Sequence, residues 1–250
     1  HFAPALLDHL QIPYTGAGTE AIFLTSNKPL AKEIMHKEGI PTPAWFTSGG
    51  VLTGALPSDT FIIKASWEHA SVGLDENSVV RVTDKKDIIR LMQERKQQLG
   101  GECFAEAYID GREFNIALLA SASGVQVLPA AEMLFPGFGP DKLKLLDYRA
   151  KWVEGTFEYE NTTRTLDIAA EDNELISRLQ NIARKCWDLF GLRGYARVDF
   201  RVDKDGNPWV LEINANPCLS LEAGFAFAVE KANLQYYEAI ERIVKDAHTL

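Results

Sequence analysis

The sequence predicts an α+β fold, and three observations support this assignment. Helical and extended patterns alternate along the 250 residues, but several extended segments follow one another across short turns, as antiparallel hairpins do. The clearest hairpin joins two segments of period-two alternation, residues 195–202 and 208–214, through a turn rich in Asp, Gly and Asn. The composition, with 46% hydrophobic and 24% charged residues, is typical of a globular protein.

The first half of the chain contains three helix signals and several strands. Pro29 suits a first helical turn and Gly39 a helix exit, while Asp84 is a good N-cap and Gly100 a good stop. In chain order, we expect a helix at 3–10, a helix at 29–37, strands at 61–65 and 79–82, a helix at 84–99, and strands at 103–109, 113–120 and 126–131.

The second half begins with a stretch that has no clear period. Residues 136–163 mix Gly, Pro and charge, and an irregular segment of this length is either functional or disordered. A helix is expected at 172–190 because its apolar residues recur with helical spacing. The hairpin follows, and a final helix is expected at 221–247.

The hairpin places two acids opposite each other. If Asp203 faces Pro208, Asp199 lies opposite Glu212 and Arg197 lies opposite Asn214. The predicted buried face then consists of Ala196, Val198, Phe200, Trp209, Leu211 and Ile213. Opposed carboxylates repel, whereas a divalent cation would hold them together, and Asp, Glu and Asn oxygens suit Mg²⁺. The alternative is a solvated sheet face with ordinary surface charges.

Bulk properties exclude several partners. A net charge of −9 argues against binding a nucleic-acid backbone. We expect no membrane association, because no apolar stretch is long enough to cross a bilayer, and no signal peptide, because the first residues lack a basic segment. The three cysteines are widely spaced and form neither a zinc pattern nor a disulfide framework. These features predict a cytoplasmic protein.

Other charged residues occupy positions where phosphate chemistry is plausible. Lys64 ends an apolar strand before the small polar loop 68–73, which suits a phosphate site or an ordinary strand end. Glu106 and Glu113 flank a short connection that reads as a domain hinge or as a simple hairpin. Lys151 lies in an aromatic-flanked part of the long loop, as lid lysines do.

In this order the features resemble the ATP-grasp superfamily, and more narrowly the D-alanine–D-alanine ligases. The matching phrases are LDHLQIPYTG at 7–16, NKPLAK at 27–32, IKA at 63–65 with ASVG at 70–73, AEAYI at 105–109, DYRAKW at 147–152 and EINANP at 212–217. The likeness covers nearly the whole chain. It implies ATP-dependent ligation of a carboxylate to an amine, with amino acids or small peptides as substrates and a homodimer as one open assembly.

The resemblance also assigns residues to roles. It implies phosphate binding by Lys28, Lys64 and a closing loop that includes Glu68, Ser71, Val72 and Gly73; adenine contacts at Glu106, Ala107 and Ile109; a ribose contact at Glu113; and γ-phosphate contact at Lys151. Mg²⁺ or Mn²⁺ would be held by Asp199, Glu212 and Asn214. Arg197, with Lys151 and Ser71, would be catalytic, since a fixed cation stabilises the acyl phosphate and the oxyanion.

The implied architecture has two α+β lobes with ATP in the cleft between them. The expected segments are a remnant of a preceding domain at 1–17, a small lobe at 18–107 and a large catalytic lobe at 108–250, with the domain that precedes the ATP-grasp region in the ligases largely missing.

Three positions depart from the ligase pattern. Ala70 replaces the first of two adjacent serines, Ala107 replaces the lysine after the hinge glutamate, and residues 216–222 replace a Ser-Pro-Gly-Met-like turn. Two alternatives therefore stay open: a ligase for other amino acids or peptides, and a non-catalytic ATP-binding module.

Overall fold

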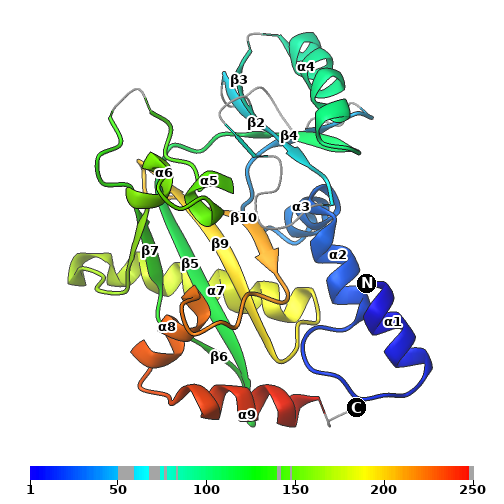
Figure 1. Ribbon diagram of the computed structural model, residues 1–250, viewed down its shortest axis with the longest axis vertical. Coiled ribbons are helices and arrows are strands. Elements are labelled where there is room, and N and C mark those ends of the chain that lie inside the picture. Colours follow the sequence, from blue (N-terminus) through cyan, green and yellow to red (C-terminus); the bar gives the residue numbers. More distant parts are fainter. Residues whose placement is uncertain are drawn as a thin grey trace. The chain divides into compact units, whose positions relative to one another are not determined.

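The computed structural model describes residues 1–49, 59–67, 74–75, 78–82, 84–139, 142–146 and 148–247. They form two compact units: unit 1 comprises His1–Thr25, Arg112–Met133 and Arg164–Leu250, and unit 2 comprises Ser26–Gly111 and Leu134–Thr163. Each unit combines a sheet with helices, so the predicted α+β class is confirmed (Figure 1). The boundaries 1–17, 18–107 and 108–250 stay a prediction about domains.

Unit 2 is built on a four-stranded antiparallel sheet. The order is β1 (Trp45–Thr47), β4 (Cys103–Ala107), β2 (Thr60–Ala65) and β3 (Val79–Arg81). Helix α4 (Lys85–Gln98) begins after Asp84, whose carboxylate accepts a bond from the Lys86 N–H, as the sequence predicts. Its apolar side packs on the sheet through Ile88 and Met92, which contributes the core of the unit.

Helix α3 (Lys28–Lys37) belongs to the same unit. Asn27 caps it by accepting a bond from the Leu30 N–H, and Pro29 occupies its first turn. Its buried side consists of Ala31, Lys32 and Met35. A lysine on an apolar helix face requires a buried counter-charge, and the site below supplies one.

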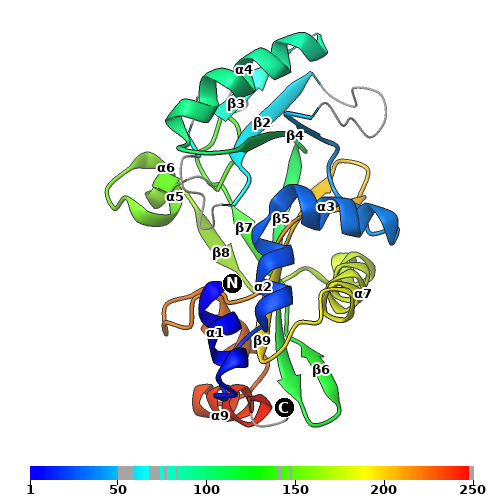
Figure 2. The same cartoon turned by 90° about the vertical axis from the view of Figure 1, so that its right-hand side faces the viewer.

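Unit 1 is a layered structure. Its sheet has the order β10 (Pro208–Asn214), β9 (Tyr195–Asp203), β5 (Gly111–Ser121), β7 (Ala131–Leu134) and β8 (Thr163–Thr165), and β6 (Gly124–Val127) pairs with β5. Helix α7 (Asn173–Leu189) covers one face, and α8 (Gly224–Lys231) and α9 (Tyr236–Asp246) cover the other (Figures 1 and 2). Phe225, Val229 and Ile243 of α8 and α9 pack on Ala117 and Leu119 of β5. At the N-terminus lie α1 (Phe2–His9) and α2 (Thr19–Ser26), the latter not predicted.

Several sequence expectations are corrected. The strands at 103–109 and 113–120 are not a hairpin, because β4 and β5 belong to different sheets. The strand expected at 126–131 divides into the end of β6 and the start of β7, around Pro129, which cannot donate to a ladder. The final helix divides into α8 and α9, with Asn233 at a positive φ of 57° between them. Residues 136–163 include two short helices, α5 (Tyr148–Trp152) and α6 (Phe157–Glu160).

The β9–β10 hairpin follows the predicted register at one end only. Glu212 pairs with Asp199 and Asn214 with Arg197, as predicted. A bulge between Val210 and Glu212 shifts the turn end by one residue, so Pro208 faces Val202 and not Asp203.

The bulge also changes the buried face. Val210 is fully buried opposite Phe200, whereas Trp209 and Leu211, which were expected inside, are half-buried. The Trp209 indole N–H donates to the Asp203 carboxylate. The opposite face is not a solvated surface either, because Asp199 and Arg201 are 5% and 3% exposed. Among the described residues, no helix is both long and apolar enough to cross a membrane.

Candidate functional site

The carboxylate of Asp199 is the centre of a polar cluster in unit 1. Arg197 donates to it twice, with 2.7 Å from Nε to Oδ1 and 2.8 Å from Nη2 to Oδ2. Asn115 donates from Nδ2 to Oδ1 at 2.8 Å and Asn214 from Nδ2 to Oδ2 at 3.1 Å. The sheet order β10–β9–β5 brings these side chains together, since period-two alternation puts them on one face. Sequence analysis missed Asn115, because its strand position does not reveal that β5 lies beside β9.

Asn214 also reaches the second acid of the hairpin. Its Nδ2 lies 3.4 Å from Oε1 of Glu212, so one amide group stands between the two opposed carboxylates. Burial by itself lowers the pKa of Arg197, but the charge and hydrogen bonds of Asp199 outweigh it and raise the pKa above its usual value. The arginine is therefore a permanent cation at this face.

The donor chemistry of the cluster fits a hard divalent cation. Asp199, Glu212 and Asn214 offer two carboxylates and one amide oxygen from paired positions of one hairpin, and Mg²⁺ takes one or two carboxylates together with water or phosphate oxygens. Rotation of the Asn214 amide would present its oxygen where its nitrogen now lies. The cluster has only two carboxylates, and in the described parts of the chain no group of three or more His, Cys, Asp or Glu side chains is arranged to hold a metal.

A second buried pair lies in the same unit. Arg201 Nη2 is 2.9 Å from Glu113 Oε2, and both side chains are more than nine-tenths buried. The structure thus gives Glu113 a charged protein partner on the sheet, and the ribose contact expected of it stays a prediction.

Unit 2 holds a separate cluster around Glu106. Lys32 Nζ lies 2.5 Å from Oε2 and Lys64 Nζ lies 2.5 Å from Oε1 of this carboxylate, whose side chain is 1% exposed. Lys32 also donates to Thr42 Oγ1 at 2.7 Å. Burial raises the pKa of Glu106, but the two ammonium groups outweigh burial and hold the pKa below its usual value.

Lys32 is a residue that sequence analysis missed. The signal was present, because Lys28 and Lys32 are four residues apart in Asn-Lys-Pro-Leu-Ala-Lys and four-residue spacing keeps two side chains on neighbouring turns. The side chain of Lys32 is 1% exposed, whereas that of Lys64 is 17% exposed. Only Lys64 therefore retains access to solvent and to a ligand.

The remaining predicted residues divide between the units. Unit 2 contains Lys28, Lys64, Glu106, Ala107, Ile109 and Lys151. Unit 1 contains Glu113, Arg197, Asp199, Glu212 and Asn214. The Lys28 N–H donates to the Ser66 carbonyl, and the Ala107 N–H to the Ala44 carbonyl. Ile109 follows β4 and Lys151 lies in α5, both half-buried. Glu68, Ala70, Ser71, Val72 and Gly73 lie outside the described residues.

Comparisons with known proteins agree on one family. The model "D-ala D-ala ligase C-terminus" matches residues 57–245. A D-alanine–D-alanine ligase of Synechococcus sp. (strain JA-2-3B'a(2-13)) is 31% identical over 97% of this chain and 70% of its own length. A protein of Sinorhizobium fredii named "Uncharacterized protein y4sG" is also 31% identical, over 98% of this chain and 69% of its own.

Solved structures show the same fold. A D-alanine–D-alanine ligase of Bacillus anthracis in complex with ATP superimposes with a TM-score of 0.72 at 21% identity, over 98% of this chain and 73% of that one. The corresponding enzyme of Coxiella burnetii gives a TM-score of 0.72 at 19% identity, over 98% of this chain and 63% of that one. The match to the family model and the identity to the Synechococcus enzyme show that this chain, with its ATP-grasp fold, belongs to the D-alanine–D-alanine ligase family.

Proposed function

We propose that this chain is an ATP-dependent carboxylate–amine ligase that joins two amino acids, with D-alanine as the first candidate for both. Family membership supports the reaction class. The observation that carries the proposal is the cluster in which Arg197 and Asn214 bind the Asp199 carboxylate with Glu212 beside them. A structural sheet face has no need of two opposed acids with a permanent cation.

The reaction proceeds in two balanced steps. A carboxylate oxygen of the first amino acid attacks the γ-phosphorus of ATP, and ADP leaves with the electrons of the broken P–O bond. The amine of the second amino acid then attacks the acyl carbon, loses a proton, and phosphate leaves. Arg197 faces the charge that develops on the acyl phosphate and on the oxyanion, and a fixed cation in a dry site stabilises both.

Asp199, Glu212 and Asn214 would hold Mg²⁺ or Mn²⁺. When bound, the ion neutralises charge on the phosphate oxygens. In the structure Arg197 donates to both oxygens of Asp199 and Asn214 donates to one of them, so a bound ion would need Arg197 or Asn214 to release an oxygen. A guanidinium with five donors can do so and turn those donors toward a phosphoryl oxygen.

Lys28, Lys64 and Lys151 are proposed to bind phosphate oxygens, with adenine at Glu106, Ala107 and Ile109. Glu106 supports the role of Lys64, because its buried carboxylate fixes the ammonium through one contact of 2.5 Å. An ammonium group has three donors, so two stay available for phosphate.

Two positions of the chain bear on the substrate pair. Ala70 and the turn at Cys218 depart from the ligase pattern, so a ligase for other amino acids or peptides is the second candidate. Loss of catalysis is disfavoured because the cluster of Arg197, Asp199, Glu212 and Asn214 is complete. We place the reaction in the cytoplasm, where ATP is available; a homodimer stays a prediction.

The test is release of ADP from Mg-ATP by the purified chain in the presence of D-alanine, L-alanine and dipeptides. We expect ADP only when a carboxylate and an amine substrate are both present. Release with L-amino acids alone would contradict D-alanine as the substrate. Tight Mg-ATP binding without ADP under any acceptor would contradict the enzymatic proposal.

A further inference from the structure

The segment 134–163 of unit 2 contains a buried acid with two cationic partners. Glu158, in α6, is 4% exposed. Lys142 Nζ donates to its Oε1 at 2.6 Å, and Arg149 Nε lies 3.4 Å from its Oε2. The hydrogen bond from Lys142 outweighs burial and lowers the pKa of Glu158 below its usual value. A charged carboxylate on α6 thus pairs with one cation on α5 and one that precedes α5.

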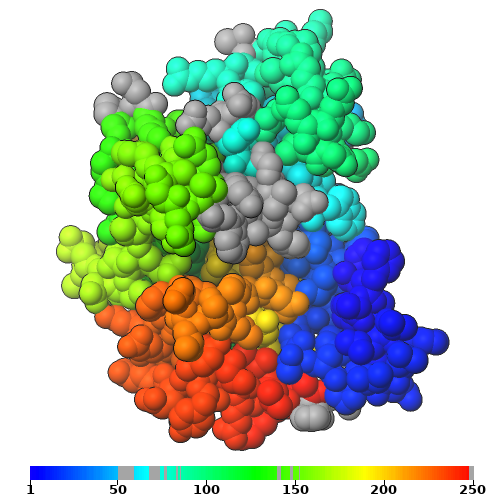
Figure 3. Space-filling view, viewed as in Figure 1, coloured from blue at the N-terminus to red at the C-terminus, as the bar shows by residue number. Residues whose placement is uncertain are grey.

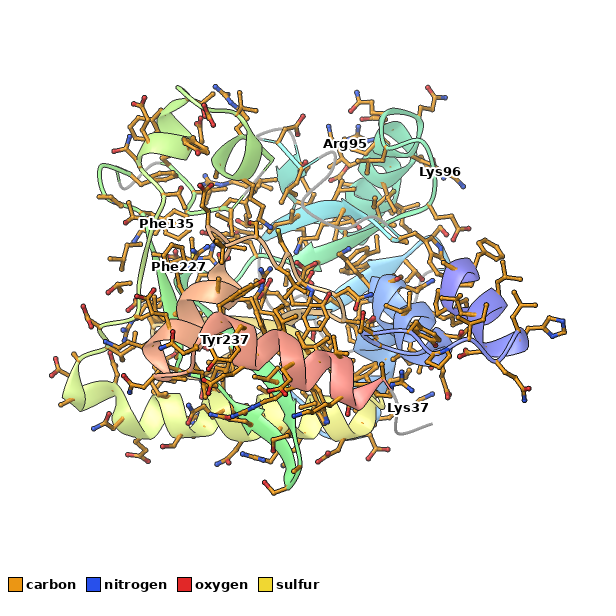
Figure 4. All side chains as sticks on the ribbon, turned by 60° about the horizontal axis from the view of Figure 1, so that its bottom comes forward. Lys37, Arg95, Lys96, Phe135, Phe227 and Tyr237 are labelled. Atoms are coloured by element: carbon orange, nitrogen blue, oxygen red, sulfur yellow. The ribbon has the colours of Figure 1, made fainter. Side chains whose placement is uncertain are left out.

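Aromatic rings hold the Lys142 side of this cluster. Its Nζ is 4.2 Å from the ring centroid of Phe157 and 5.3 Å from that of Phe138, which are cation–π distances. The two rings lie 5.3 Å apart between centroids. Phe135, which follows β7 and is labelled in Figure 4, extends the stack with a centroid 5.3 Å from that of Phe138. Lys142 is therefore fixed on Oε1 of the acid, and Oε2 is left to the cation on α5.

The second oxygen of Glu158 depends on Arg149. Oε2 is inaccessible to solvent and accepts no hydrogen bond from any residue that the structure describes. Burial of a carboxylate oxygen is unfavourable unless a charge compensates it, and the Arg149 guanidinium supplies that charge. Because the Arg149 side chain is 48% exposed, the pair contributes modest stability. Its main consequence is to fix the face that α5 turns toward α6.

Helix α5 needs such a contact to keep its orientation. It has five residues, and a helix this short is unstable without tertiary contacts. Ala150 of α5 is buried, next to the arginine that pairs with α6. The connection to α6 is also tied, because Thr156, the N-cap of α6, donates from Oγ1 to the Val153 carbonyl at 2.7 Å. The position of α5 therefore follows that of α6.

Lys151 is the cation of α5 that this arrangement leaves without a counter-charge. Its side chain is half-buried, and its ammonium forms no hydrogen bond or ion pair with any residue in the described ranges. Side chains two residues apart in a helix do not face each other, so fixing Arg149 against α6 turns Lys151 away from Glu158. The green atoms of α5 and α6 form part of the outer surface (Figure 3), so a ligand can reach this segment from solvent.

We propose that Glu158 is a positioning residue for phosphoryl transfer, which orients α5 through Arg149 so that the Lys151 ammonium meets the γ-phosphate of ATP. The inference rests on the proposed function, in which Lys151 binds phosphate oxygens. Glu158 and Arg149 act through Lys151 and contact neither the nucleotide nor the substrates. Their loss should therefore affect only nucleotides that carry a γ-phosphate.

The experiment compares the full chain with Glu158→Gln, which keeps the shape of the side chain and removes its charge. Calorimetry with Mg²⁺ measures the binding of ADP and of AMP-PNP, a non-hydrolysable ATP analogue that retains a γ-phosphate. We expect the variant to bind AMP-PNP about fivefold more weakly and ADP equally well. Loss of a negative charge by itself would tighten the binding of both anions, so weaker binding of AMP-PNP alone indicates lost positioning. Unchanged affinity for AMP-PNP would overturn the inference.

The matched control is Glu160→Gln on the same helix. Glu160 is exposed, and its carboxylate forms no ion pair within the described part of the chain. The substitution removes the same charge two residues away, so both nucleotide affinities should stay unchanged. Equal weakening of AMP-PNP binding in Glu160→Gln and Glu158→Gln would contradict a specific role for Glu158.

Variants of α5 test whether the effect passes through Lys151. Arg149→Ala should weaken AMP-PNP binding as Glu158→Gln does, whereas Arg149→Lys keeps the charge and should retain most of the affinity. In a chain that carries Lys151→Met, adding Glu158→Gln should cause no further loss, because both residues act through one ammonium. Additive losses in the double variant would overturn the inference.

Hydrogen exchange without nucleotide separates this inference from the proposed function. Mass spectrometry follows the amides of residues 148–153, which should exchange faster in Glu158→Gln than in the unmodified chain or in Glu160→Gln. Unchanged exchange would overturn the inference. If exchange is faster but Lys151→Met binds AMP-PNP and ADP like the unmodified chain, the link between α6 and α5 stands and the phosphate role proposed for Lys151 fails.

Discussion

Arg197 binds both oxygens of Asp199, two residues along the same strand, through contacts of 2.7 and 2.8 Å. The pair is adjacent on one face of β9 because side chains at i and i+2 share a face. The proposed metal ligand Asp199 and the cation proposed to face the phosphoryl group are thus coupled, because any movement of Asp199 away from Arg197 frees donors of the arginine.

We expect Asp199→Ala to damage both stability and activity. The substitution leaves Arg197, whose side chain is 21% exposed, without its counter-charge. Breaking a fully buried ion pair costs about 3–5 kcal/mol, and the partial exposure of Arg197 places the expected loss at the lower end. The measurement is denaturant unfolding followed by circular dichroism, together with ADP release. A variant as stable as the unmodified chain would show that the pair is not buried in solution.

Glu212→Ala should lower activity without the loss of stability expected for Asp199→Ala. Glu212 is half-buried, so its loss should change the melting temperature little while ADP release falls about 100-fold or more, as for loss of a charged group that acts in the transition state. The control is Glu241→Ala, whose carboxylate is 57% exposed and pairs with Lys245 on α9. Full turnover in Glu212→Ala would refute the metal assignment.

How much of this site the sequence predicts depends on whether its contacts are local. The pairing of Asp199 with Glu212 follows from alternation and turn length within one hairpin, and the structure confirms it. The bulge near Leu211 could not be predicted from the sequence. It shifts the pairing between the two strands by one residue, but the alternation of apolar and polar residues along each strand stays the same.

Contacts between distant segments were beyond sequence reasoning for a different reason. Asn115 contacts Asp199 only because β5 is the neighbour of β9 in the sheet. Lys32 contacts Glu106, although the two residues are 74 positions apart in the sequence (106 − 32). A period-two or helical pattern predicts on which face of its strand or helix a side chain lies, but it does not predict which other element packs against that face. Lys32 reads as a surface lysine until its partner is known.

The two lysines that flank Glu106 should respond differently to substitution. Lys32→Met removes a side chain that is 1% exposed and leaves the buried Glu106 with one partner, so unfolding should become easier by about 3 kcal/mol or more. Lys64→Met, at a side chain that is 17% exposed, should cost less stability and raise the KM for ATP. Chemical denaturation and initial rates distinguish them, with the 67%-exposed Lys37 as the control, Lys37→Met. Equal KM values for ATP in Lys64→Met and the unmodified chain would contradict phosphate binding by Lys64.

The three cysteines should differ in reactivity. Burial raises the pKa of the Cys103 thiol, and raises that of Cys186 to about 12. The exposed Cys218 has a lowered pKa, chiefly because of its hydrogen bond with Ser220. Iodoacetamide at neutral pH should therefore modify Cys218 first, since the thiolate is the reacting form, and Ser220→Ala should slow it. Peptide mapping by mass spectrometry checks the order, and modification of Cys186 in the folded chain would contradict it.

Acid should weaken the Glu106 cluster in a defined pH window. The folded pKa of Glu106 lies below its usual value of 4.5, so the carboxylate contributes its stabilisation fully above that value and loses it as pH falls through the lower, folded pKa. Glu106→Gln removes the charge at every pH and leaves Lys32 buried without its carboxylate. The variant should thus melt well below the unmodified chain at neutral pH, and the gap between them should narrow as the medium is acidified toward about pH 3. The measurement is the melting temperature of both chains across this pH range. A difference in melting temperature that stays constant with pH would show that Glu106 does not titrate with a depressed pKa.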